Sequence, residues 1–144
     1  MGRSPETDGP FEGREKSSLV FMARRFPRRT LNAIAPTKYI RIRSGTEHRF
    51  IWIWMVVVGE RVFVRSWNDH PNGWHRAFLE EPRGFIEIGG REVRIQALER
   101  RGERLMKAIE QAYAEKYRTP ASLKYVAGFR RPKRRSTTME LVPR

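Results

Sequence analysis

The chain has 144 residues, and its 30 Lys and Arg against 16 Asp and Glu give a formal net charge of +14. This length fits one domain around one hydrophobic core, and a hydrophobic content of 39% is too high for a wholly disordered protein. The absence of cysteine excludes disulfides, Fe–S clusters, cysteine-ligated zinc and thiol nucleophiles. The longest apolar run, residues 50–58, is far shorter than the ~20 residues of a spanning helix, so we expect a cytoplasmic protein with no membrane partner.

The first elements in chain order are a leader and a short helix. Residues 1–18 carry Gly, Pro, Ser and mixed charges without any period, and we predict a disordered leader there. Residues 19–144 are predicted to form a single domain. A short helix is expected to begin near Pro27, which is tolerated at a first helical position, and to end before Pro36.

After this helix the apolar period changes to two. Residues 38–43 place Ile40 and Ile42 on one face, which is typical of a half-buried strand. Residues 48–58 are apolar on both faces, and we predict one central strand there. Both of its faces then need cover, one from a barrel interior or a helix and the other from a helix or a second subunit, so a homodimer is expected.

Glycines mark two hairpins in the following part of the chain. Gly59–Glu60 and Gly89–Gly90 each join two apolar segments, and two-residue connections of this kind favour tight hairpins. The other predicted elements are strands at residues 62–67, 84–88, 91–97 and 137–142, a short helix at 74–80 and one long helix at 98–117. This order predicts a small, mostly antiparallel β-barrel with helices at its ends.

The usual catalytic signatures do not occur in the sequence. The three histidines lack a metal-binding spacing, so no metal site is predicted, and there is no glycine-rich nucleotide loop or serine nucleophile elbow. Asp69 stands in a turn-forming segment, where a turn alone explains it. The sequence therefore does not support catalysis by a pair of carboxylates.

Two short segments combine groups that suit a phosphate. Residues 43–46 and residues 65–68 each bring an arginine, hydroxyl groups and turn N–H groups together. Trp67 and Trp74 offer a flat wall for a planar ring. The structural alternative is that the tryptophans cap the barrel while the arginines pair with glutamates.

The C-terminal end holds most of the excess positive charge. Residues 116–144 contain nine basic residues and one acidic residue. Such a concentration attracts phosphates, although a solvated basic loop explains it equally well. The basic run consists of Arg130, Arg131, Lys133, Arg134 and Arg135.

Six short motifs occur in order within residues 37–144, namely residues 40–43, 53–58, 62–66, 73–76, 112–117 and 138–144. In this order they resemble a small bacterial family of unknown function that is grouped with the FMN-binding split barrels. The resemblance implies a mainly β (α+β) fold, a small antiparallel split β-barrel with one long and one or two short helices. It also implies a homodimer with FMN or a deazaflavin bound between the subunits.

The resemblance further implies roles for particular residues. Contacts to a phosphate are implied for Arg43, Ser44, Thr46 and Arg65, and contacts to the ring for Ser66, Trp67 and Trp74. The chain lacks the Gly-Arg-Lys-rich phosphate turn of the deazaflavin-dependent reductases. Its equivalent turn offers only His48 and Arg49, while Arg76, like Arg65, is a candidate to stabilise an anionic reduced ring.

Three functions follow as hypotheses. The first is a flavin- or deazaflavin-binding split barrel acting as an oxidoreductase on an unidentified small molecule. The second is a basic nucleic-acid-binding module, in which the basic run and aromatic strand faces hold single strands. The third is a cofactor-free dimeric barrel that serves as a binding or structural module.

Overall fold

The computed structural model describes residues 24–144. The leader predicted for residues 1–18 lies outside the described residues, as does the start of the predicted domain. The strands are β1 (Ile40–Ser44), β2 (Ile51–Ile53), β3 (Val56–Val58), β4 (Arg61–Val64), β5 (Arg83–Ile88), β6 (Arg91–Glu99) and β7 (Met139–Pro143). The helices are α2 (Arg28–Ile34), α3 (Trp74–Glu80), α4 (Glu103–Lys116), α5 (Pro120–Gly128) and α6 (Pro132–Arg135).

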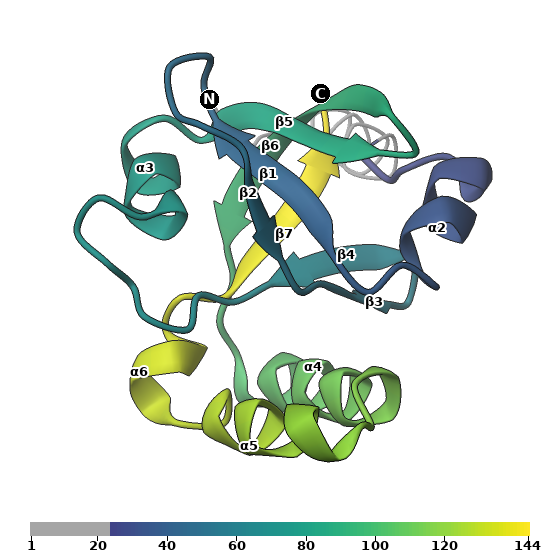
Figure 1. Cartoon of the computed structure of the whole chain (residues 1–144), viewed down its shortest axis with the longest axis vertical. Helices are drawn as coiled ribbons and strands as arrows, with labels where there is room; N and C mark the ends of the chain where they lie inside the picture. Colours follow the sequence, from purple (N-terminus) through teal and green to yellow (C-terminus); the bar gives the residue numbers. More distant parts are fainter. Residues whose placement is uncertain (1–23) are drawn as a thin grey trace, which may run out of the picture.

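The strands form one curled antiparallel sheet in the order β2-β1-β5-β6-β7-β4-β3 (Figure 1). Strands β2 and β3 stand at opposite ends of this order although only Trp54 and Met55 separate them in the chain. The sheet therefore has to curl until its two ends approach each other. This arrangement confirms the predicted mainly β, α+β class and the barrel-like antiparallel sheet.

The prediction of one central strand at residues 48–58 is wrong, because the segment bends and supplies both end strands of the sheet. The bend is fixed by Tyr117, whose hydroxyl accepts a hydrogen bond from the Met55 N–H (3.1 Å) and donates one to the Lys38 carbonyl oxygen (2.6 Å). The Lys116 ammonium also donates to the Met55 carbonyl oxygen (2.9 Å). Both backbone groups of Met55 are thus satisfied by α4 and the residue after it rather than by a neighbouring strand.

The helices are more numerous than predicted: the described residues contain five, against one long and one or two short. Helices α5 and α6 were missed. The long helix is also shorter than predicted, because β6 continues to Glu99, which pairs with Met139 of β7. Gly102 then has a φ of 112°, so that α4 begins only at Glu103. The two hairpins are confirmed, and Gly89 and Gly90 have φ values of 58° and 77°.

Two apolar clusters hold the fold together. The first fills the curl of the sheet and includes Ile40, Ile42, Met55 and Val64. The second lies between the sheet and the helices α4 and α5, where Phe63 contributes from β4. Alternation along β4 therefore sends one side chain inward and the next toward the helices. Residues 65 and 67 continue the helix-facing set.

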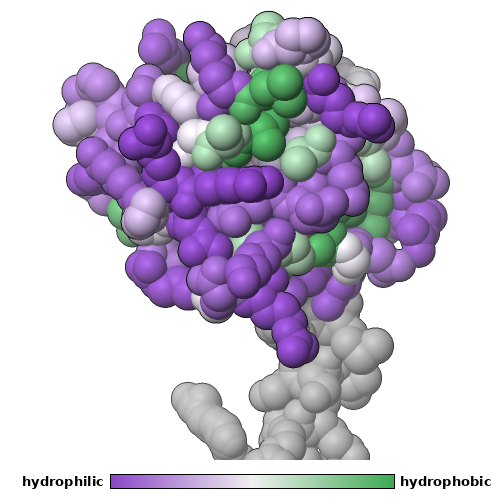
Figure 2. All heavy atoms as spheres, turned by 90° about the horizontal axis from the view of Figure 1, so that it is seen from below, coloured by the Kyte–Doolittle hydropathy of each residue, from purple (hydrophilic) through white to green (hydrophobic). Residues whose placement is uncertain are grey.

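The helices α4, α5 and α6 lie together below the sheet (Figure 1). Seen from that side, the molecule is mostly hydrophilic, with a few apolar areas between the polar side chains (Figure 2). Within residues 24–144, no helix combines the length and the apolar character needed to cross a membrane.

Candidate functional site

The chain leaves the sheet after Val64 of β4, and the loop that follows borders two cavities. Residues 66–69 line both of them. The first, which we call the aromatic cavity, has a volume of about 710 Å³. The second, which we call the basic cavity, has a volume of about 960 Å³ and lies against α5 and the residues around α6.

The aromatic cavity is lined by all four tryptophans of the chain, Trp52, Trp54, Trp67 and Trp74. Trp54 is stacked on Tyr117, with ring centroids 3.9 Å apart and planes 5° from parallel. Trp74 is buried, whereas Trp52 is 66% exposed at the open side. Tyr39 also lines the cavity and is 43% exposed, so the cavity combines fixed walls with two aromatic side chains that face solvent.

Trp67 is held in place from several sides. The rings of Tyr125 and Phe129 meet it edge to face, at centroid distances of 4.8 and 5.5 Å. A Cβ atom on Gly128 would lie 2.3 Å from Cη2 of Trp67, so only glycine allows α5 to approach this closely. The Arg134 guanidinium lies 3.5 Å from the centroid of the indole ring.

Polar groups occur along one side of the aromatic cavity. The ring nitrogens of His48 lie 3.0 Å from the Arg49 carbonyl oxygen and 3.4 Å from that of Asn72. Arg49 is exposed and has no ion pair among residues 24–144. Together with Asn68, these residues supply hydrogen-bonding groups and a cation next to the aromatic walls.

Arg65 lies under the loop with a side chain that is 0% exposed. Its guanidinium donates to the Glu110 carboxylate (2.9 Å), the Phe129 carbonyl oxygen (2.9 Å) and the Thr138 hydroxyl (2.8 Å). Burial lowers the pKa of Arg65, and the hydrogen bond to Glu110 opposes this effect. The residue therefore fixes the start of the loop to α4, to the residue that precedes β7 and to the end of α5.

Asp69 fixes the other end of the loop with a φ of 45°. Its carboxylate accepts hydrogen bonds from Arg76 (3.0 and 3.1 Å) and lies 2.8 Å from Nδ1 of His75. The hydrogen bond from Arg76, followed by that from His75, lowers the pKa of Asp69. The other ring nitrogen of His75, Nε2, is buried without a hydrogen-bond partner among the described residues.

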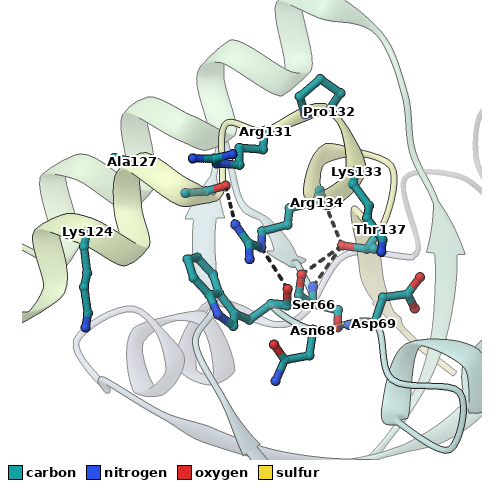
Figure 3. Close-up of a pocket in the computed structure, with 12 residues that line it drawn as sticks. Ser66, Asn68, Asp69, Lys124, Ala127, Arg131, Pro132, Lys133, Arg134 and Thr137 are labelled. Carbon is teal, nitrogen blue, oxygen red and sulfur yellow. Dashed lines mark hydrogen bonds between the residues drawn. The ribbon is translucent and has the colours of Figure 1, made fainter.

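The basic cavity brings cationic side chains opposite the loop (Figure 3). Lys124 comes from α5, Arg131 directly precedes α6, and Lys133 and Arg134 belong to α6. Arg134 donates from Nε to the Trp67 carbonyl oxygen (2.8 Å). Arg135, which belongs to the basic run, donates hydrogen bonds to Glu103 and Glu110 on α4 and does not line the basic cavity.

The structure brings together five of the nine sequence-predicted site residues. His48, Arg65, Ser66, Trp67 and Trp74 all line the aromatic cavity. Arg43, Ser44, Thr46 and Arg76 line neither cavity.

The four residues outside the cavities have other contacts. The Arg43 guanidinium lies over the rings of Phe50 and Phe85. Ser44 donates its hydroxyl hydrogen within the protein, with the carbonyl oxygens of Ala77 and Glu81 at 3.1 and 2.7 Å. Thr46 is in an exposed turn after β1, and Arg76 is bonded to Asp69 as described above.

Several cavity residues were not predicted from the sequence. The sequence prediction places Trp52 and Trp54 on a covered strand face, and their spacing of two puts both on one side of an extended chain. Tyr125 and Phe129 stand one helical turn apart on the missed helix α5 and its end. The Thr119–Pro120 pair at the start of this helix is the signal that could have found it, since proline is favoured at a first helical position.

These features define a protein built on a curled antiparallel sheet, with an aromatic and a basic cavity on the two sides of one loop. The chain belongs to the family DUF2255, described as an uncharacterized protein conserved in bacteria, whose model matches residues 30–141. This match confirms the bacterial family of unknown function that the motifs indicated. No curated protein matches the chain.

Proposed function

We propose that this chain is a split-barrel protein that binds a flavin-type cofactor, FMN or a deazaflavin, with the ring in the aromatic cavity. The observation that carries the proposal is that all four tryptophans line this one cavity. Its volume of about 710 Å³ falls within the range of small-molecule sites, roughly 300–1,000 Å³. The curl that brings β2 and β3 to opposite ends of the strand order supports the split barrel.

The residues present fit a planar ring. Trp54 and Trp67 are held by neighbouring aromatic rings, so they offer flat apolar surfaces that are already ordered before binding. Asn68 and His48 stand beside these walls and supply hydrogen-bonding groups that can fix the orientation of a ring. Preorganised walls with a few polar groups are typical of cofactor sites.

The chemistry divides between the cofactor and the chain. When bound, a flavin-type group supplies hydride or electron transfer itself. The chain binds and orients the ring, excludes water from its faces and needs no acid–base pair of its own. Arg65 acts as a positioning residue, because its guanidinium is occupied by Glu110, Thr138 and a backbone carbonyl.

The exposed residues of the aromatic cavity indicate where a second subunit would bind. Trp52 and Tyr39 line it and are 66% and 43% exposed. We place the second subunit of a homodimer against this side, which leaves the ring between subunits and within reach of a small-molecule substrate. An oxidoreductase of this type needs access to the ring from one face only.

The test is reconstitution of the full chain with FMN, with FAD and with a deazaflavin. We expect one of them to bind with a dissociation constant on the order of 1 µM or below, measured by quenching of tryptophan fluorescence and by calorimetry. Trp67→Leu should weaken binding about 10–100-fold, because stacking of a planar base on one aromatic side chain contributes on the order of 1–3 kcal/mol.

The matched control is Phe85→Leu, which removes an aromatic ring that lines neither cavity. This variant should bind as the unaltered chain does. Thermal unfolding of each variant establishes that it is folded before binding is compared. A folded, unaltered chain that binds none of the three cofactors refutes the proposed function.

A further inference from the structure

The basic cavity borders the aromatic cavity along residues 66–69. Residues of this one loop therefore form part of the wall of both cavities. Three features of the basic cavity show what kind of group it would accept: a fixed cation, a set of further cations, and the lack of a free carboxylate.

Arg134 is the fixed cation. Its guanidinium is half-buried over Trp67, with Nε bonded to the Trp67 carbonyl oxygen (2.8 Å) and Nη1 to the Gly128 carbonyl oxygen (3.3 Å). Nη2 makes no hydrogen bond with any residue of the described part of the chain. An arginine held in this way keeps N–H donors available for an oxyanion and loses little side-chain entropy on binding it.

Lys124, Arg131 and Lys133 are the further cations. All three are exposed, and none forms an ion pair within residues 24–144. They come from two neighbouring helices and the turn between them, and Figure 3 shows Lys124 and Lys133 at opposite flanks of the loop residues. Like charges gathered in one hollow repel one another, so an anion there is favoured.

Asp69 is the carboxylate that lines this cavity. Both of its oxygens accept hydrogen bonds from Arg76, and one of them also faces His75. It therefore does not neutralise the lysines and arginines across the hollow. The cavity keeps a positive excess next to an aromatic wall.

We propose that the basic cavity binds the phosphate group of the ligand whose ring occupies the aromatic cavity, through Arg134, Lys124, Arg131 and Lys133. The location of the ring rests on the proposed function, whereas the phosphate site rests on these cations alone. The resemblance pointed instead to Arg43, Ser44, Thr46 and Arg65, which are engaged elsewhere or lie outside the basic cavity.

The experiment compares FMN with riboflavin, which has the same ring and lacks the phosphate. Pyrophosphate serves as a probe without a ring, and all three affinities are measured by calorimetry at low salt. The test variant is the triple substitution Lys124→Gln, Arg131→Gln and Lys133→Gln. The control triple, Arg104→Gln, Lys107→Gln and Arg130→Gln, removes the same charge from exposed positions outside both cavities.

We expect the dissociation constant of FMN to be lower than that of riboflavin by a factor of about ten or more. The test variant should lose this preference and its affinity for pyrophosphate, while the control variant keeps both. Equal binding of FMN and riboflavin overturns the phosphate site and leaves the proposed function standing.

The remaining outcomes also separate the two proposals. Pyrophosphate binding that is lost in the test variant, in a chain that binds none of FMN, FAD and a deazaflavin, supports the phosphate site and refutes the proposed function. If the unaltered chain binds neither pyrophosphate nor any of the cofactors, both the phosphate site and the proposed function are refuted. A single-stranded oligonucleotide that displaces FMN and binds more tightly, with the same dependence on the three cations, overturns the small-molecule site in favour of nucleic acid.

Discussion

Glu110 on α4 accepts hydrogen bonds from two arginines, Arg65 (2.9 Å) and Arg135 (2.6 Å). Arg65 has no exposed side-chain surface, and Glu110 is itself buried. Arg135 is further fixed by Glu103, and these hydrogen bonds raise its pKa. One member of the basic run is therefore committed to the fold, and its charge is not available to an external anion.

This arrangement predicts a large effect of Glu110→Gln. The substitution keeps the size of the side chain and leaves the Arg65 guanidinium without its counter-charge, so we expect a loss of about 3–5 kcal/mol in the free energy of unfolding. The measurement is urea denaturation at neutral pH. The control Glu60→Gln breaks the exposed pair with Arg28, and it should cost about 0–1 kcal/mol. Equal effects of the two substitutions would show that the buried pair has no special importance.

At the scale of elements, the sequence predicted best those features that are local. The hairpin at Gly89–Gly90 follows from two adjacent residues, and helix α3 at residues 74–80 follows from a short segment that ends before Pro82. The break at Trp54–Met55 depends on Tyr117, more than sixty residues later. The apolar pattern of residues 48–58 gives no sign of a contact with Tyr117, so it predicts one uninterrupted strand.

The same distinction applies to the candidate site. Residues 66 and 67 could be predicted because they stand beside Arg65 at the end of the segment predicted as a strand at 62–67, and they do line both cavities; β4 itself ends at Val64. Lys124 and Phe129 could not be predicted with them, because their helix reaches the loop only through the close approach of Gly128 to Trp67. That approach is a tertiary contact that leaves no periodic signal in the sequence.

The bend at Met55 gives a second prediction. Tyr117→Phe removes the hydroxyl that accepts the Met55 N–H and donates to the Lys38 carbonyl oxygen. Because the Met55 N–H is buried, its loss of a partner should lower the free energy of unfolding by about 1–3 kcal/mol. Tyr39→Phe removes an exposed hydroxyl and should have no measurable effect in the same denaturation series. Unchanged stability of Tyr117→Phe would mean that the bend does not depend on this hydroxyl.

At the scale of the whole molecule, charge limits where a second copy can bind. Two copies that each carry a formal charge of +14 repel each other, so a stable contact needs a surface with exposed apolar area and little charge. Strand β2 contains no charged residue and offers exposed apolar area, with the Arg41 guanidinium of β1 5.6 Å from the centroid of the Trp52 ring. It pairs only with β1, so its other edge is free in the described chain, and it carries the exposed Trp52.

The last prediction concerns this edge. We expect the unaltered chain to be a dimer by light scattering coupled to gel filtration, and Trp52→Glu to be a monomer, because the glutamate places a desolvated charge in the contact. Leu79→Glu is the matched control, since Leu79 is also an exposed apolar residue (45%) and lies on α3 outside both cavities. It should remain a dimer.

A monomeric unaltered chain would contradict the homodimer, and a dimeric Trp52→Glu variant would move the contact away from β2. The oligomeric state also bears on the proposed cofactor. Because Trp52 lines the aromatic cavity, a second copy on β2 would cover the open side of that cavity. Loss of the dimer should then weaken flavin binding even though the walls formed by Trp54 and Trp67 are unchanged, whereas Leu79→Glu should leave flavin affinity as it is.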